Sequence, residues 1–260
     1  MSAPVKDVLV DIGTDGVATI TINRPERRNG VTVETCRALY DATRAVAASA
    51  ARVVILRGAG EHFCVGADIG GGGGGEADAR APNLDDLGLL HHAATLLHTM
   101  QQVTIAAIDG GCAGAGMGYA MACDLRFAST RARFSTAFLN VAVSGDMGLA
   151  WSLNRLLGAA RMRELMFFPD KIDAPRALDL GLVSRLFAPE ALHDEAMALA
   201  CQLAARDPFA LRMIKANCLS AEELPIAAFI DVETARQLQC TARPNLAELM
   251  AAGLARTKDS

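Results

Sequence analysis

The sequence lacks the features that mark membrane-spanning, secreted and nucleic-acid-binding proteins. No apolar stretch approaches the ~20 uncharged residues that a transmembrane helix needs, and residues 1–7 contain no apolar segment typical of a signal peptide. The net charge is -4 and no basic tract occurs, so there is no electrostatic footprint for DNA or RNA. These absences predict a cytoplasmic protein with no membrane span and no nucleic-acid partner.

The seven cysteines form no pattern of a disulfide framework or a zinc site, because their number is odd and no Cys-x-x-Cys pair occurs. Most have apolar neighbours, so we expect reduced, buried core residues. Three histidines, His91, His92 and His98, fall on one expected helix, but no carboxylate or cysteine stands at ligand spacing. No metal site is therefore expected.

Hydrophobic residues, in contrast, make up 52% of the 260 residues, which is enough for one substantial core. Runs of β-branched residues and intervening turn residues predict a hairpin over 8–22 and buried strands over 53–58 and 104–108. Apolar periodicity predicts helices over 32–51, 84–100, 119–123, 192–206 and 209–220. Strands and helices alternate early and helices dominate late, which indicates an α/β core with a helical C-terminal part.

Residues 70–75 are an unbroken run of six glycines. Glycine loses more backbone entropy on ordering than any other residue, so this run predicts a mobile loop. The run formally contains Gly-x-Gly-x-x-Gly, but in a poly-glycine tract that match carries almost no information. A dinucleotide site is not expected.

Two loops, residues 61–69 and 109–118, each follow an expected strand and consist largely of small residues. Small residues let a ligand approach the backbone, and the N-terminus of a following helix leaves N–H groups free. Such a loop can hold an anion or an oxyanion. The alternative for each loop alone is a tight strand–helix turn with no ligand.

Taken together, the two loops resemble the paired signature of the enoyl-CoA hydratase/isomerase (crotonase) family. The matching stretches read Phe-Cys-Val-Gly-Ala-Asp-Ile over 63–69 and Gly-Cys-Ala-Gly-Ala-Gly-Met-Gly over 111–118. Further similar segments are residues 20–25, 132–135, 153–158 and 177–183. The resemblance extends over most of the chain.

This resemblance implies an α/β fold with a crotonase-like ββα spiral core, expected over residues 1–195. Residues 196–260 would form a C-terminal helical trimerisation region, so a homotrimer or a dimer of trimers is expected. Phe229 and Ile230 are candidate apolar residues on its exposed face. The substrate would be an acyl-CoA thioester, and no separate cofactor is expected because coenzyme A is part of the substrate.

The resemblance also assigns candidate site residues. The thioester carbonyl would accept hydrogen bonds from the backbone N–H groups of Ala67 and Ala115. Coenzyme A would lie along residues 23–25 and 65–67, and its phosphates need cations. The candidate coenzyme A contacts are Arg24, Arg28, Val65, Gly66 and Lys258. For each of the three basic residues the alternative is an ordinary solvated charge.

The chain departs from the family pattern at the proton-transfer groups. Hydratases of the family place two glutamates around a water molecule, and the matching positions here are Gly118 and Phe138. Neither side chain can transfer a proton, so hydration by two glutamates is not expected. Asp146 falls where isomerases and some other members carry a catalytic aspartate, and partial burial near Met147 and Trp151 would raise its pKa. The alternative is that Asp146 caps the helix that follows it.

Three functions follow from this pattern. The favoured one is an enoyl-CoA isomerase in which Asp146 carries the proton. The second is a hydratase or hydrolase that uses Asp146, and the third is a weakly catalytic acyl-CoA-binding protein. Among other residues, His62 is either a pocket residue or a surface histidine. Asp68 and Asp124 are expected to make local turn or capping hydrogen bonds, and Tyr119 and Trp151 are expected to be packing residues.

Overall fold

The computed structural model describes residues 6–68 and 84–256, so the expectations for residues 70–75 and for Lys258 lie outside the described residues. The strands are β1 (Val8–Ile12), β2 (Val17–Ile22), β3 (Val53–Gly58), β4 (Val103–Ile108), β5 (Gly111–Ala113), β6 (Leu125–Ser129), β7 (Arg133–Ser135), β8 (Ile172–Asp173) and β9 (Arg185–Phe187). The helices are α1 (Val33–Ala47), α2 (Leu84–Thr99), α3 (Ala115–Ala122), α4 (Leu149–Phe167), α5 (Ala174–Leu180), α6 (Leu192–Ala204), α7 (Pro208–Ala221), α8 (Ile226–Thr241) and α9 (Leu246–Arg256).

The larger sheet has the strand order β1-β2-β3-β4-β6-β9. The expected hairpin is present, since β1 and β2 pair antiparallel with Val8 opposite Ile22. Every other neighbouring pair in this sheet is parallel. Parallel strands are covered on both faces and therefore carry nearly continuous apolar runs, as in the fully buried β2 and β4.

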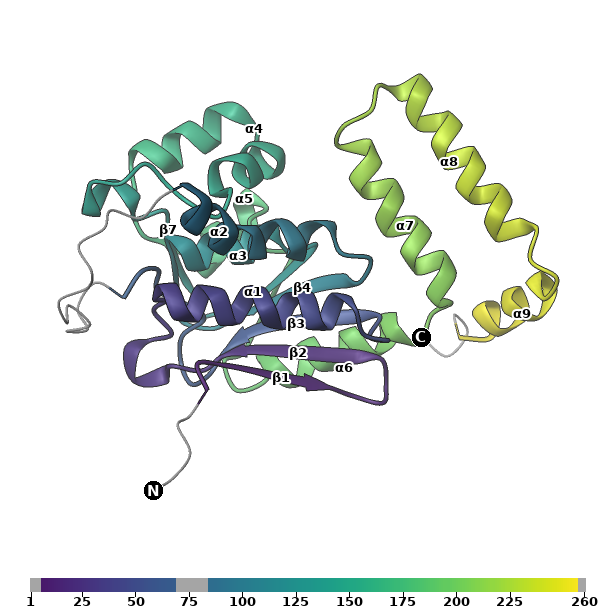
Figure 1. Cartoon of the computed structure of the whole chain (residues 1–260), viewed down its shortest axis with the longest axis horizontal. Coiled ribbons are helices and arrows are strands. Elements are labelled where there is room, and N and C mark those ends of the chain that lie inside the picture. Colours follow the sequence, from purple (N-terminus) through teal and green to yellow (C-terminus); the bar gives the residue numbers. More distant parts are fainter. Residues whose placement is uncertain (1–5, 69–83, 257–260) are drawn as a thin grey trace.

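The sheet lies between two layers of helices, and each interface has its own apolar cluster. On one face α1 contacts β1 and β2, and α2 and α3 follow alongside (Figure 1). On the other face α6 crosses β2, β3, β4 and β6, with its buried alanines against the strands. This α/β architecture positions the ends of β3 and β4, where the two candidate loops begin.

A second, three-stranded sheet of order β5-β7-β8 lies next to those loops. Its strand β5 belongs to the second loop, and an isolated parallel bridge joins Cys112 of β5 to Cys64 of the first loop. The small sheet therefore ties the two loops to each other.

The helices α7 and α8 form a hairpin that stands away from the sheet (Figure 1). A buried ion pair connects the hairpin to the core, with Lys215 Nζ of α7 at 2.5 Å from Asp124 Oδ2. Apolar side chains of α8 are exposed, including Ile230, whereas Phe229 is half-buried. Such a surface suits contact with another copy of the chain, and the trimer stays a prediction.

Two expectations about local structure need correction. The helix expected over 119–123 begins earlier, at Ala115, because the glycines in that stretch belong to the helix and not to a loop. Of the seven cysteines, Cys36, Cys64, Cys112 and Cys123 are buried, but Cys201, Cys218 and Cys240 lie on α6 to α8 and are at least partly exposed. No helix in residues 6–68 and 84–256 is long and apolar enough to cross a membrane.

Candidate active site

The first loop leaves the N–H group of Ala67 free. Val31 N donates to Gly66 O at 2.9 Å and Asp68 N donates to Val31 O at 3.0 Å, so a parallel bridge uses the polar groups on either side of Ala67. Because successive peptide groups of an extended chain point to opposite sides, the N–H of Ala67 points away from Val31. Within the described residues it donates to no protein acceptor.

The second loop leaves the N–H of Ala115 free for a different reason. Ala115 is the first residue of α3, and the first helical hydrogen bond runs from Gly118 N to Gly114 O. The first N–H groups of a helix have no partner inside it and lie at its positive end. Gly114 has φ 51° and ψ −124°, a conformation that an L-residue avoids, so glycine is required there.

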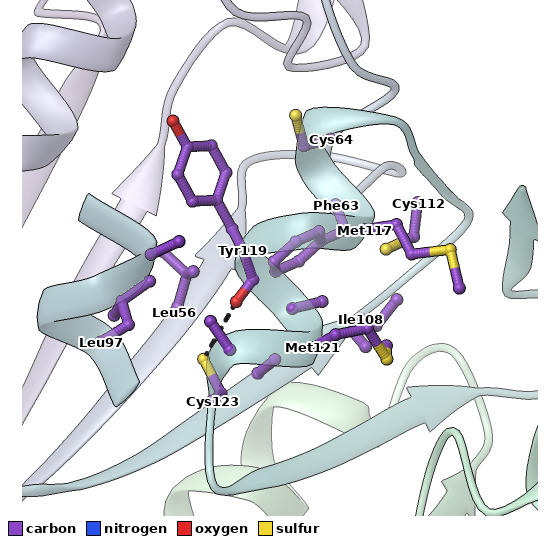
Figure 2. Packing of buried hydrophobic residues seen from close by; sticks show 14 of the residues in the cluster. Leu56, Phe63, Cys64, Leu97, Ile108, Cys112, Met117, Tyr119, Met121 and Cys123 are labelled. Atoms are coloured by element: carbon purple, nitrogen blue, oxygen red, sulfur yellow. Dashed lines mark hydrogen bonds between the residues drawn. The ribbon is translucent and has the colours of Figure 1, made fainter. Parts of the chain in front are cut away.

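Backbone contacts hold these two loops together. Cys64 N donates to Gly111 O at 3.1 Å, and Ala113 N donates to Cys64 O at 3.0 Å. A Cβ atom added to Gly66 would lie 3.1 Å from Ala113 O, so the loops approach closely. Figure 2 shows Phe63 and Cys64 of the first loop packed beside Met117 of α3. The expected pair of donors is thus brought into one place by buried structure.

Arg24 lies beneath the first loop and is engaged by protein groups. Its guanidinium contacts Gly30 O, Asp68 and Asp7. Hydrogen bonds from Arg27 and Arg24 lower the pKa of Asp68 to about 2. Asp68 thus has partners that lie 41 and 44 residues away in sequence, and the local turn bond expected for it stays a prediction. Arg24 and Arg27 thus hold Asp68, the residue that directly follows Ala67.

Arg28 and Val65 line a cavity of about 360 Å³ beside the loops, together with Lys171 and Arg133. His62 also lines this cavity, and its Nδ1 accepts a hydrogen bond from Gly111 N at 2.9 Å. The interpretation of His62 as a surface histidine is therefore wrong. A cavity with several cations at one side of the oxyanion loops suits a phosphorylated ligand.

The two positions expected to match the hydratase glutamates, Gly118 and Phe138, are occupied by packing contacts. A Cβ atom added to Gly118 would lie 2.5 Å from Met147 Cβ, so no side chain fits there without a shift of Met147. The Phe138 ring is buried, and a Cβ added to Gly114 or to Gly145 would lie 3.8 or 3.5 Å from it. The ring thus lies between the second oxyanion loop and the segment that carries Asp146.

The two neighbours of Asp146 in sequence contact these positions: Gly145 lies next to Phe138, and Met147 lies next to Gly118. Asp146 is therefore placed between the two contacts. Its Oδ1 is buried and has no hydrogen-bond partner among the described residues. Burial raises the pKa of Asp146, and the charge of His91 lowers it in part. The capping alternative was wrong, because the N-cap of α4 is Gly148 and no side chain caps that helix.

A larger cavity, of about 720 Å³, lies next to Asp146. Met147 and Gly148, the two residues that follow Asp146, form part of its wall. One wall is a face of α2, and the opposite wall combines α4 with the end of α7. Trp151 is a packing residue, as expected, but it is 42% exposed and does not lie in the core. Its ring instead meets the His98 ring edge-on at 4.9 Å and lies under the Arg155 guanidinium at 3.7 Å. Tyr119 is fully buried, as expected for a packing residue.

The model of the enoyl-CoA hydratase/isomerase family matches residues 13–251, nearly the whole chain. The chain belongs to this family. A mitochondrial Δ(3,5)-Δ(2,4)-dienoyl-CoA isomerase from Pongo abelii is 30% identical, over 81% of this chain and 68% of that protein. A 4-chlorobenzoyl coenzyme A dehalogenase from Arthrobacter sp. is 28% identical, over 92% and 87%.

The fold agrees with this family. The crystal structure of an enoyl-CoA hydratase from Polaromonas sp. JS666 superposes with a TM-score of 0.86 and is 30% identical, covering 96% of this chain and 97% of that one. These three relatives bear names for three different reactions. Membership therefore shows that the chain is an acyl-CoA enzyme of the hydratase/isomerase family. Which reaction it catalyses has to be inferred from the side chains of its own site.

Sequence reasoning missed several residues that line the cavities, among them Arg133, Lys171 and His91. The two cations stand in segments with no glycine-rich or catalytic motif, so the sequence carried no signal for them. His91 was considered only as a metal ligand. Among the described residues, no group of three potential ligands gathers to hold a metal ion.

Proposed function

We propose that this protein is an enoyl-CoA double-bond isomerase in which Asp146 carries the proton and the N–H groups of Ala67 and Ala115 hold the enolate oxygen. The observation that carries the proposal is the position of Asp146. It is a partly buried carboxyl with a raised pKa, between two family glutamate positions that hold no acid. A raised pKa favours a carboxyl that alternately takes up and releases a proton.

The reaction needs only one proton carrier. Asp146 would take a proton from C2 of a 3-enoyl thioester, and the electron pair would move onto the carbonyl oxygen. Two N–H donors would stabilise that charge, and one such donor is typically worth about 10²–10³ in rate. Return of a proton at C4 would leave the double bond between C2 and C3, so atoms and charge balance.

The second candidate is hydration or hydrolysis with a water molecule activated by Asp146. Its support is the same buried carboxyl, because any base near the thioester can deprotonate water. Hydration in this family's manner uses two carboxylates, and residues 118 and 138 supply none. The isomerase is favoured because it needs one carboxyl, which Asp146 supplies, whereas hydration needs two.

The test is incubation with 3-enoyl-CoA and 2-enoyl-CoA thioesters in D₂O, with deuterium incorporation and double-bond position followed by mass spectrometry and ultraviolet absorbance. Asp146→Asn should lower bond migration by about 10²–10⁴ because it removes the general base. Full turnover by Asp146→Asn would exclude the proposed mechanism. Tight binding without exchange, migration or hydration in the unaltered protein would indicate an acyl-CoA-binding protein instead.

For coenzyme A we propose contacts with Arg28, Val65 and Gly66, supported by the cation-lined cavity beside them. Arg24 would act through Asp68 to position the loop. Lys258 remains a candidate from outside the described residues. We also propose a cytoplasmic homotrimer or dimer of trimers, supported by the exposed apolar residues of α8. Sedimentation showing only monomer at micromolar concentration would contradict that assembly.

A further inference from the structure

The face of α2 that lines the larger cavity carries three residues at helical spacing, His91, Thr95 and His98. Residues separated by three or four positions lie on one side of a helix, so these side chains share the cavity wall. The adjacent His92 also borders the cavity but is more exposed. The cavity therefore has three histidines, and their hydrogen bonds distinguish them.

Two of the three histidines have hydrogen-bond partners in the protein. His92 Nδ1 lies 3.2 Å from Thr95 Oγ1, and His98 Nε2 lies 3.1 Å from Glu222 Oε2. His91 has neither a hydrogen bond nor an ion pair within the described part of the chain, and it is only half-buried. Its imidazole is thus available to a ligand in the cavity.

Asp146 presents the matching acceptor. Its buried Oδ1 has no partner among the described residues, and the two residues after it form part of the same cavity wall. A positive charge on His91 would lower the pKa of this carboxyl. His91 lines this cavity and Asp146 directly precedes two residues of its wall, and no hydrogen bond joins the two side chains among the described residues.

We infer that His91 is the second proton carrier of the active site and works with Asp146 on opposite ends of the migrating double bond. This inference rests on the proposed isomerase. C2 is bonded to the thioester carbonyl and so lies near the oxyanion loops, whereas C4 lies two bonds farther along the acyl chain. Asp146 takes the proton from C2, and the protonated imidazole of His91 delivers a proton to C4. Transfer of the proton from Asp146 to His91 then restores both groups.

The other ionisable groups around Asp146 cannot share this task. Cys36 of α1, Cys64 of the first loop and Tyr119 of α3 each sense the charge of Asp146. Burial raises the pKa of Cys36, raises that of Cys64 to about 12 and raises that of Tyr119 well above its usual range. These three groups stay neutral near pH 7. His91 is left as the neighbour that can hold a positive charge.

The experiment compares His91→Gln with His92→Gln, which alters the same cavity wall one residue away. Deuterium exchange at C2 and bond migration are measured separately in D₂O. In His91→Gln, migration should fall about 100-fold while exchange at C2 persists, because Asp146 can still remove and return that proton. In His92→Gln the ratio of migration to exchange should stay as in the unaltered protein. A parallel loss of both rates in His91→Gln would overturn the inference.

A second measurement does not depend on turnover. Carbon-13 NMR of the Asp146 carboxyl should give a higher pKa in His91→Gln, since the charge of His91 lowers it, and no such rise in His92→Gln. Equal values in the two variants would overturn the pairing. If the unaltered protein neither exchanges nor isomerises any enoyl-CoA, the isomerase proposal fails, and the NMR comparison alone decides whether His91 acts on Asp146.

Discussion

The oxyanion loops and the wall that carries Asp146 face the same candidate substrate, yet they constrain the sequence in different ways. The loops offer backbone N–H groups, so Ala67 and Ala115 need no functional side chain and the neighbouring residues need only be small. The wall that carries Asp146 offers side chains, and there residues 118 and 138, which are expected to match the hydratase glutamates, are glycine and phenylalanine. In the proposed reaction the backbone N–H groups stabilise the enolate intermediate. The side chains near it would determine whether that enolate is protonated at another carbon or reacts with water.

The most direct test of the role of the backbone N–H groups is a substitution at Ala115. Proline at the first residue of a helix is tolerated, because the missing N–H has no helical partner. Ala115→Pro should therefore keep α3 folded while removing one oxyanion donor. We expect kcat/KM for the isomerisation to fall by about 10²–10³.

Ala115→Gly is the matched control for this variant, because it changes the same side chain and keeps the N–H. The far-ultraviolet circular dichroism and Tm of both variants should be compared with those of the unaltered protein. If Ala115→Pro retains its spectrum and also its activity, Ala115 is not an oxyanion donor.

The contact between Gly118 and Met147, next to Asp146, predicts a smaller effect, which is on the free energy of unfolding. Alanine normally stabilises a helix relative to glycine by up to about 1 kcal/mol. At Gly118 the added Cβ would lie 2.5 Å from Met147 Cβ, so Gly118→Ala should instead lower the free energy of unfolding by about 1–3 kcal/mol.

Gly88 of α2 supplies the control, because no atom lies within 4 Å of a Cβ added there. Gly88→Ala should be neutral or stabilising in the same urea titration. A stabilising Gly118→Ala would mean that Met147 does not occupy this space.

The smallest effect expected is the pH dependence that Asp146 gives to stability. Burial raises the pKa of this carboxyl in the folded protein above its unfolded value, so the folded state binds the proton more tightly. Stability from this group is complete below the unfolded pKa and is lost as pH rises through the folded pKa. Asp146→Asn should therefore raise Tm at pH 7 more than at pH 4. Equal shifts in Tm at both pH values would contradict a raised pKa.

The sequence predicted the parts of the site that depend on local signals. Buried β-branched strands followed by small residues indicated both candidate loops, and the expected hairpin and most helices are present. These features depend on residues close together in the chain, where periodicity and glycine content are informative.

The sequence could not predict contacts between distant residues. Asp68 pairs with Arg27 across 41 positions, and Asp124 pairs with Lys215 across 91. The local bond expected for Asp124 was therefore wrong, and the distant partners of Asp68 were not predicted. The sequence likewise suggested only one role for His91, that of a metal ligand beside His92 and His98. That His91 and the segment after Asp146 border one cavity depends on how α2 packs beside α3, which no short motif records.

The contact between Gly118 and Met147 also limits how this site can change by single substitutions. A glutamate at 118 would meet Met147 Cβ, and only glycine at 147 removes that atom. Met147 has φ 49°, a conformation that glycine adopts without strain, so Met147→Gly would remove the Cβ that a side chain at 118 would meet. Gly118→Glu alone introduces this clash, and Met147→Gly alone leaves a hole in the packing. A carboxyl at 118 is therefore not gained by one substitution without a loss of stability, because residues 118 and 147 have to change together.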